Sequence, residues 1–526
     1  MESSLPHHPS FASTDAYISS LIAFTSTPLF NQLVGGVHIL DFFTSSPPLY
    51  DSIIPLDWRE YFETKTIDEI LETLLRTDLA TIRPEGIPDS LYEFAENIQK
   101  HELLREVVVE LGEVEDQHKL NRQRKLAQGM NNKKLHEVEH FARYLSGLLN
   151  SIATDSTGES ITHLVDFGSG QSYLSRILAS PPHNLDLIAV ESKASNIEAG
   201  KFLDTKVGLT ARSQGKTLKQ SLDSADVKKG SIKYVQHMIK DESMKEVLEA
   251  LEQSEDEEKK TKDPGLMIIS LHSCGNLIHH ALNALLANDE VKSVAVVGCC
   301  YNLMTERTGP TYKPPYQKHI PAENTPIPSG CLNHHFPLST RLSSQSITLN
   351  ITARMMAVQA PRNWTQETSS DFFKRHFYRA LLQRIFFEKG VLSATEPLIV
   401  GSLRKAAYTG FYEYVTSAVR KILNASSGPN EGSSVGEGVK AKIKEMRLDS
   451  IEREEVESYE ERYGKGLKEL SVMWTLMAFC AGCVESLVVA DRWCYLTESG
   501  RCKVVKVEAA FEYGVSPRNL VIVGVK

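Results

Sequence analysis

The chain has 526 residues, of which 41% are hydrophobic, and this length and composition predict a large core and more than one structural unit. Its net charge of −9 argues against a protein that coats nucleic acid along its whole surface. The eight cysteines have no regular spacing, which argues against a disulfide framework and favours the cytoplasm or nucleus.

Two further features argue against secretion and membrane association. The N-terminus has no basic segment followed by an apolar one. The longest uncharged apolar stretch, residues 470–484, is shorter than the roughly 20 residues that cross a bilayer. We therefore expect this stretch to form a buried helix.

The first part of the chain has the spacing of helices. Leu103, Val107 and Leu111 are one example, and proline-containing turns interrupt the pattern, so residues 1–128 are predicted to form an α-helical domain. Residues 117–136 contain no acidic residue but six basic ones: Lys119, Arg122, Arg124, Lys125, Lys133 and Lys134. This stretch is suited to the phosphates of an RNA substrate, and a solvated helix face or loop is an equal alternative.

Apolar runs of strand and helix length alternate between residues 129 and 301. Strands are predicted at 161–167, 185–190, 232–238, 266–271 and 293–299, and helices at 172–179, 193–203 and 277–286. Such alternation predicts a parallel, doubly wound α/β sheet. The charged residues 252–264 are predicted to be a solvated loop.

The turn after the first strand has the residues of a nucleotide site. Gly168 and Gly170 allow backbone conformations closed to other residues, and the following helix directs free N–H groups at the turn. Glu191, at the tip of the second strand, is placed to accept the hydroxyls of a ribose. The spacing Asp166-x-Gly168-x-Gly170-x-Ser172 resembles the Asp/Glu-x-Gly-x-Gly-x-Gly of class I methyltransferases, with serine replacing the last glycine. An ordinary strand, turn and helix without a ligand is the alternative.

The last residues contain two more strand candidates, 502–511 and 520–525. A class I methyltransferase sheet ends with an antiparallel pair of strands. We therefore expect residues 302–484, largely helical and with a flexible linker at 424–438, to be an insertion. Residues 485–526 would then supply a helix and strands six and seven of a seven-stranded Rossmann-like sheet.

Polar residues follow the fourth and fifth strands, where an open α/β sheet binds its ligand. Methyl transfer to a hydroxyl or a protonated amine requires a base, and His272 is the predicted base. Tyr301 and Asn302 are predicted to stack on and hydrogen-bond a nucleobase. The alternatives are that His272 caps the next helix and that Tyr301 and Asn302 are turn residues.

The cysteines near these strand ends also suggest a zinc site or a nucleophile. Because adjacent residues of a strand point to opposite faces, Cys299 and Cys300 are not expected to share a metal, so we predict packing cysteines and no metal. The pair Cys480 and Cys483, in the apolar stretch, is predicted to be core as well.

One competing motif is the His136-Glu137-x-x-His140 sequence, which fits the zinc proteases. The extended protease motif has glycine and histidine where this chain has Arg143 and Ser146. A zinc protease is therefore a remote alternative.

Several motifs together resemble the methyltransferase-like protein 25 family, in the same order along most of the chain. They are Lys133-Lys134-x-His136-Glu137, Asp166-Phe-Gly-Ser-Gly170, Leu271-His-Ser-Cys-Gly-Asn-Leu277, Gly298-Cys-Cys-Tyr-Asn302, Asp491-Arg492 and Ser516-Pro-Arg-Asn519. The resemblance implies a class I fold that uses S-adenosylmethionine. It assigns cofactor binding to Asp166, Gly168, Ser169, Gly170 and Glu191, and it leaves Lys133, Lys134, His136 and Cys274 as candidate substrate contacts.

The substrate is an inference at one remove, because the family is similar to the tRNA ribose methyltransferases. This chain lacks an Asn/Asp-Pro-Pro-Tyr motif after the fourth strand, which argues against methylation of exocyclic base nitrogens. The expected function is therefore an S-adenosylmethionine-dependent methyltransferase acting on RNA. A protein methyltransferase and a non-catalytic scaffold are the alternatives, and the sequence does not define the oligomeric state.

Overall fold

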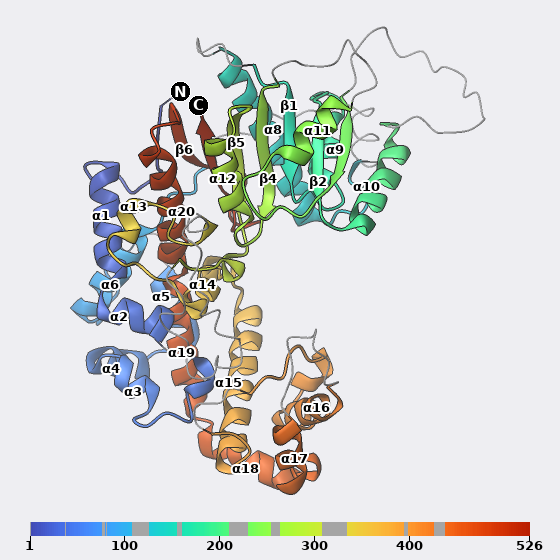
Figure 1. Cartoon of the computed structure of the whole chain (residues 1–526). Helices are drawn as coiled ribbons and strands as arrows, with labels where there is room; N and C mark the ends of the chain where they lie inside the picture. The colour runs from blue at the N-terminus through green and yellow to red at the C-terminus, as the bar shows by residue number, and fades with distance from the viewer. Residues whose placement is uncertain are drawn as a thin grey trace, which may run out of the picture.

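One mixed sheet of seven strands organises the upper part of the molecule in the computed structural model (Figure 1). The structure describes residues 2–36, 38–75, 79, 82–107, 126–154, 160–209, 230–253, 264–307, 334–393, 398–425 and 437–526. The strands are β1 (His163–Phe167), β2 (Leu187–Glu191), β3 (Ile232–Gln236), β4 (Leu266–Ser273), β5 (Val291–Gly298), β6 (Val504–Ala509) and β7 (Leu520–Val525).

The order of the strands is β3-β2-β1-β4-β5-β7-β6. The first five strands in the chain pair in parallel, whereas β7 runs antiparallel to both β5 and β6. The predicted class I fold with a C-terminal antiparallel pair is therefore confirmed.

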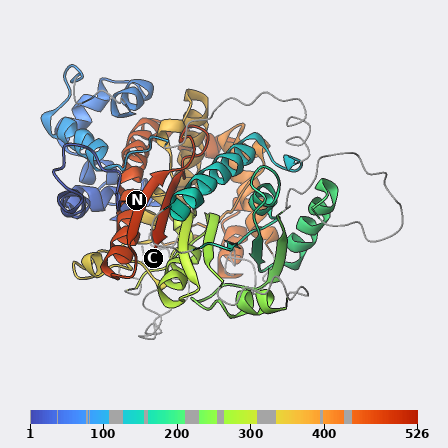
Figure 2. The ribbon, with the colours of Figure 1, turned by 90° about the horizontal axis from the view of Figure 1, so that it is seen from above.

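Helices cover both faces of the sheet (Figure 2). Side chains alternate between the faces, so Leu164 of β1 belongs to the core cluster that contains α8 and α9, whereas Val165 and Phe167 belong to the cluster that contains α12 and α20. These helices and their neighbours are α8 (Asn132–Thr154), α9 (Tyr173–Ala179), α10 (Ala194–Val207), α11 (Lys245–Glu252), α12 (Leu277–Ala287) and α20 (Ala481–Glu498). The two layers fix the carboxyl ends of β1, β2, β4 and β5 along one edge of the sheet.

The N-terminal helices and the inserted helices share one hydrophobic core with α20. The first group is α1 (Thr14–Thr25), α2 (Pro28–Asn31), α3 (Leu49–Ile53), α4 (Leu56–Glu63), α5 (Ile67–Leu75) and α6 (Asp89–His101). The second group is α13 (Thr340–Ser343), α14 (Ile351–Met356), α15 (Gln366–Glu388), α16 (Phe411–Asn424), α17 (Glu437–Glu445), α18 (Arg453–Tyr463) and α19 (Gly466–Phe479). The described helices of the N-terminal region, for which a separate domain was expected, therefore share a core with the inserted helices.

The N-terminus also contacts the sheet. The backbone N–H of Ser4 donates to the carbonyl of Val505, and the N–H of Val507 donates to the carbonyl of Ser4, both at 3.0 Å. The first residues thus cover the outer edge of β6, and the two chain ends lie near each other (Figure 1).

The long apolar segment forms α19 and α20, and the expected boundary at residue 484 falls inside α20. Residues 466–498 are long and apolar enough to span a membrane, but 94% of their most apolar window is buried inside the protein, as in a core helix. Cys480 and Cys483 are fully buried there. The expected linker core at 426–436, the acidic residues 254–263 and the basic residues 117–125 lie outside the described residues.

Candidate active site

The glycine turn begins where β1 ends, and three of its residues have left-handed backbone conformations. Gly168 has a φ of 68° and Gly170 of 57°. A Cβ on Gly168 would lie 2.9 Å from Cδ2 of Leu277, so close packing also requires glycine there. Ser172 is buried with a φ of 56°, a conformation that costs a non-glycine residue roughly 1 kcal/mol. This backbone explains why the related motif has glycine at that position.

Two buried carboxylates hold the turn. Glu191, at the tip of β2, accepts the N–H of Gly170 at 2.9 Å through Oε2 and the N–H of Lys193 at 2.8 Å through Oε1. Asp166 accepts the hydroxyl of Ser175 at 2.6 Å, which joins the end of β1 to the first turn of α9. Burial raises the pKa of Asp166 to about 6, although the Ser175 hydrogen bond opposes that rise.

His272, at the end of β4, pairs with a carboxylate from a different element. Its Nε2 lies 3.3 Å from Oε2 of Glu137, which α8 brings over this edge of the sheet. The other oxygen of Glu137 accepts the hydroxyl of Ser516 at 2.7 Å. Burial alone raises the pKa of Glu137, but the hydrogen bonds from His272 and Ser516 and the charge of Lys134 hold it below its usual value. Glu137 therefore orients His272 as a buried carboxylate.

Lys134 lies one turn before Glu137 on α8. It is within electrostatic range of Glu137, Asp166 and Cys274. Burial lowers the pKa of Lys134, although these three groups oppose that shift. The structure thus brings Lys134, Asp166, His272 and Cys274 together. Lys133 is more exposed, with its Nζ 4.0 Å from Oε1 of Glu137.

Three cysteines meet beside His272. The Sγ of Cys274 lies 3.4 Å from that of Cys299 and 3.4 Å from that of Cys300, and the latter two are 3.6 Å apart. The prediction that Cys299 and Cys300 point to opposite faces is wrong, because β5 ends at Gly298 and both residues belong to the following turn. The hydrogen bond from Cys299 lowers the pKa of Cys274 to about 6 and the bond to Cys274 raises the pKa of Cys299.

Tyr301 does not have the exposure that its predicted role, stacking on a nucleobase, requires. Its side chain is buried and its hydroxyl donates to Oε1 of Glu485 at 2.9 Å. Oε2 of Glu485 pairs with Arg105 and, at 2.6 Å, with Arg518. Tyr301 is therefore a packing residue, and stacking on a nucleobase does not fit its position. Asn302, beside it, is half-buried.

The two histidines of the protease-like motif do not form an open metal site. Nε2 of His136 accepts the N–H of Glu512 at 3.3 Å, and the ring of His136 packs 3.9 Å from that of His140. Glu137, which would activate water in a protease, is engaged by His272 and Ser516. The zinc-protease alternative does not fit this arrangement.

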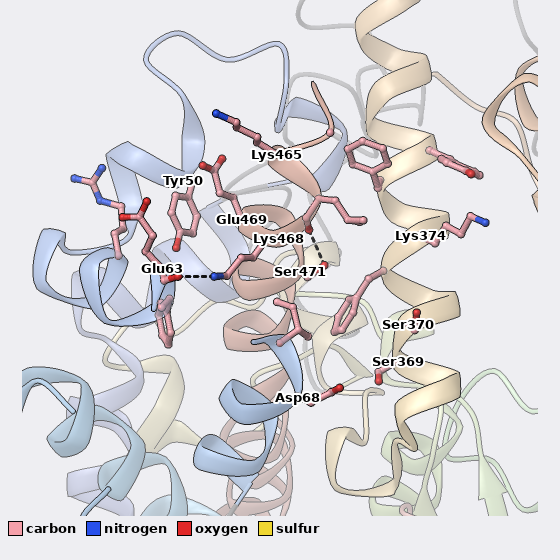
Figure 3. Close-up of a pocket in the computed structure, with 18 of the residues that line it drawn as sticks. Tyr50, Glu63, Asp68, Ser369, Ser370, Lys374, Lys465, Lys468, Glu469 and Ser471 are labelled. Carbon is pink, nitrogen blue, oxygen red and sulfur yellow. Dashed lines mark hydrogen bonds between the residues drawn. The ribbon is translucent and has the colours of Figure 1, made fainter. Parts of the chain in front are cut away.

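A cavity of about 1010 Å³ lies elsewhere, between the N-terminal helices and helices α15 and α19 (Figure 3). Tyr50, Lys374, Lys465 and Glu469 are among its lining residues, and Lys468 donates to the carbonyl of Glu63 at 2.8 Å there. It shares no lining residue with the strand tips. The chemistry-bearing residues therefore lie at the sheet edge and not at this cavity.

Three residues that support the candidate site, Glu137, Ser516 and Glu485, were not predicted from the sequence to have this role. Glu137 was visible as the carboxylate of the Lys-Lys-x-His-Glu motif, and Ser516 as the first residue of a motif without an assigned role. Glu485 carried a signal too, because it is an isolated acid in a long apolar stretch.

Comparisons with known proteins agree with this geometry. The model of a methyltransferase domain family matches residues 133–307. The chain is 26% identical over 264 residues to the probable methyltransferase-like protein 25 of Mus musculus, and 26% identical over 267 residues to that of Homo sapiens. Each match covers 49% of this chain and 37% of the relative, so the chain spans little more than a third of the length of these curated relatives. No solved structure matches significantly. The matches confirm the family resemblance.

Proposed function

Because the chain contains a methyltransferase domain and is related to the methyltransferase-like protein 25 family, we propose that it transfers methyl groups from S-adenosylmethionine to RNA. One observation carries this proposal: the glycine turn and a candidate base lie at the same edge of the sheet. Glu191 holds the turn, and the base is His272, which the buried carboxylate of Glu137 orients.

The residues present fit the cofactor. A Cβ on Gly170 would meet nothing within 4 Å, so its left-handed backbone faces open space where a ligand can approach the turn. Asp166 and Glu191 place negative charge beside that space, which suits the positive sulfonium and ammonium groups and the ribose hydroxyls. When bound, S-adenosylmethionine supplies an electrophilic methyl group.

His272 is the base in this proposal. With Nε2 directed at Glu137, its Nδ1 is the nitrogen left to take a proton from the acceptor. The side chain is 41% exposed, so an acceptor can reach it. Glu137 is a positioning residue that holds the ring and stabilises the charge that the ring gains on protonation. A hydroxyl or a protonated amine is the acceptor that benefits from such a base.

RNA is favoured as the substrate by positive charge next to this base. Lys133 and Lys134 begin α8, at the end of the basic stretch of residues 117–136. Phosphate groups along a bound strand would meet these lysines while a hydroxyl reaches His272.

Replacing Asp166 by alanine is expected to lower the affinity for S-adenosylmethionine by about 100-fold, because the turn loses both a charge and its link to α9. Isothermal titration measures this affinity. Asp289→Ala, at an exposed aspartate paired with Arg501, serves as the control and should bind normally.

The same carboxyl gives a pH signature. Since the pKa of Asp166 is raised to about 6, the wild-type affinity should fall as the pH drops below 6 and the carboxyl gains a proton. Asp166→Asn mimics the protonated form, so its affinity should be weak and lack this pH dependence. Unchanged affinity in both variants would mean that the turn does not bind the cofactor.

Replacing His272 by alanine is expected to slow methyl transfer by 100-fold or more, in the range typical of a lost general base, while cofactor affinity stays unchanged. Glu137→Gln should cause a smaller loss and shift the pH profile of the rate, because the amide orients the ring less well. The rates come from label transferred from methyl-labelled S-adenosylmethionine. Equal rates in the wild type and His272→Ala would exclude His272 as the base.

To identify the acceptor, the purified protein and methyl-labelled S-adenosylmethionine are incubated with RNA and protein pools from cells that lack the protein. Label incorporated into RNA, and not into protein, is the expected result. Label in protein alone would contradict RNA as the substrate and favour the alternative of a protein methyltransferase. Cofactor binding without label in either pool would favour the non-catalytic scaffold.

A further inference from the structure

The three cysteines that meet beside His272 have the geometry of a metal site. Among the histidine, cysteine, aspartate and glutamate residues that the structure describes, these three cysteines form the group whose ligand atoms are close enough together to hold a metal ion. Tetrahedral zinc with sulfur ligands at about 2.3 Å places its sulfurs about 3.8 Å apart. The sulfurs of Cys274, Cys299 and Cys300 are 3.4, 3.4 and 3.6 Å apart, so shifts of a few tenths of an ångström complete the geometry.

The backbone fixes the two turns that carry these cysteines. The N–H of Gly275 donates to the carbonyl of Cys300 at 3.3 Å, and the amide group of Asn276 exchanges hydrogen bonds with Thr305 at 2.6 and 3.0 Å. Gly275 has a φ of 57°, and a Cβ there would lie 2.7 Å from the carbonyl oxygen of Leu303. The close approach that unites the cysteines therefore depends on glycine at 275, and the site is organised before any ion binds.

Two cations flank the sulfurs and suit their thiolate form. Lys134 is within electrostatic range of Cys274 and Cys299. Arg492 is 1% exposed and within electrostatic range of Cys299, and its Nε and Nη1 have no hydrogen-bond partner among the described residues. A buried guanidinium with unpartnered nitrogens favours negative charge nearby, and three thiolates with one divalent ion have a net charge of −1.

We propose that Cys274, Cys299 and Cys300 bind one Zn²⁺ ion as thiolates, with the fourth position open to solvent. Thiolate ligands select soft and borderline ions such as zinc. Three protein ligands with one open position are typical of zinc sites that bind a water or a substrate atom, whereas structural sites have four protein ligands. Cys274 is exposed, so solvent can reach an ion held by the three sulfurs. The proposal does not depend on methyl transfer.

The test uses the full chain, purified under reducing conditions and stripped of metal with a chelator. Titration with Co²⁺ should saturate at one equivalent and give the thiolate-to-cobalt charge-transfer absorption and the strong visible bands of a tetrahedral site. Zn²⁺ should then displace the cobalt and raise the temperature of thermal unfolding. A chain that shows no thiolate absorption with Co²⁺ would overturn the proposal.

Cys274→Ser and Cys300→Ser should each lose the charge-transfer band and bind Zn²⁺ about 100-fold more weakly in competition with a chromogenic chelator. Cys502→Ser removes a half-buried thiol outside the cluster and should leave both readouts unchanged. Circular dichroism of the metal-free proteins checks that the variants fold. If they do not, the cobalt spectrum of the wild type still decides between a thiolate site and none.

Two other outcomes would also overturn the proposal. One is a cobalt band that survives in both cluster variants or disappears equally in Cys502→Ser. The other is a disulfide between Cys274 and a neighbour, detected by peptide mass spectrometry of the protein purified under reducing conditions, because an oxidised pair leaves a single thiol for the metal.

Discussion

A chain that ends at Arg501 is expected to lose the folded methyltransferase domain and all cofactor binding. The missing segment contains β6 and β7, and β7 lies between β5 and β6 in the sheet. Its large buried apolar side chains are Val504, Val505, Val507, Phe511, Leu520, Val521, Ile522, Val523 and Val525. At roughly 1.5–3 kcal/mol for each, their combined loss is comparable to or larger than the roughly 5–15 kcal/mol by which a typical domain is stable.

The truncation also removes two contacts of the site. Ser516 no longer donates to Glu137, and Arg518 no longer pairs with Glu485. Circular dichroism, thermal unfolding and titration with S-adenosylmethionine measure the outcome. Val515→Ala changes an exposed side chain of the same segment and should leave all three unchanged. A truncated chain that still bound the cofactor would show that five strands suffice for the site.

The sheet could be predicted from the sequence because its signals are local. Each parallel strand is an apolar run of the right length, and the motif around Asp166 occurs at a strand end where such motifs function. The last two strands required one additional idea, that a sheet of this class closes with an antiparallel pair. That idea located β6 and β7 within a few residues of their observed ends.

The remaining features depend on contacts between distant segments. Whether Cys299 and Cys300 converge depends on where β5 ends, and a shift of one residue reverses the side to which a strand residue points. The burial of Tyr301 depends on Glu485, which lies far away in the sequence on α20. Likewise, the apolar faces of the N-terminal helices do not reveal that they pack against α19 and α20. Local sequence patterns therefore predict where helices and strands lie, but they do not predict which distant residues contact each other.

Glu485 is the residue whose single replacement is expected to destabilise the fold most. Its carboxylate is buried between Arg105 and Arg518 and accepts the hydroxyl of Tyr301. Arg105 also donates to Asn519 at 3.0 Å, so the carboxylate joins the segment after α6, α20, the turn after β5 and the loop before β7. Glu485→Ala leaves two buried guanidinium groups without their counter-charge, which typically costs about 3–5 kcal/mol.

The pH dependence of this effect has a defined sign. Burial alone raises the pKa of Glu485, but the charges of Arg105 and Arg518 and the Tyr301 hydrogen bond outweigh it and hold the pKa below its usual value. A depressed pKa in the folded state adds stability above the unfolded pKa, and that stability is lost as the pH falls through the folded pKa. The gap in unfolding free energy between wild type and Glu485→Ala should therefore narrow in acid.

Urea unfolding at neutral and acidic pH measures both effects. Glu454→Ala, at an exposed position on α18, provides the matched control, and its unfolding free energy should stay within about 0.5 kcal/mol of wild type. Since Glu485 joins the turn after β5 to the loop before β7, the variant should also lower the affinity for S-adenosylmethionine. Equal unfolding free energies for Glu485→Ala and the control would mean that the two arginines find other partners and that the carboxylate does not hold these segments together.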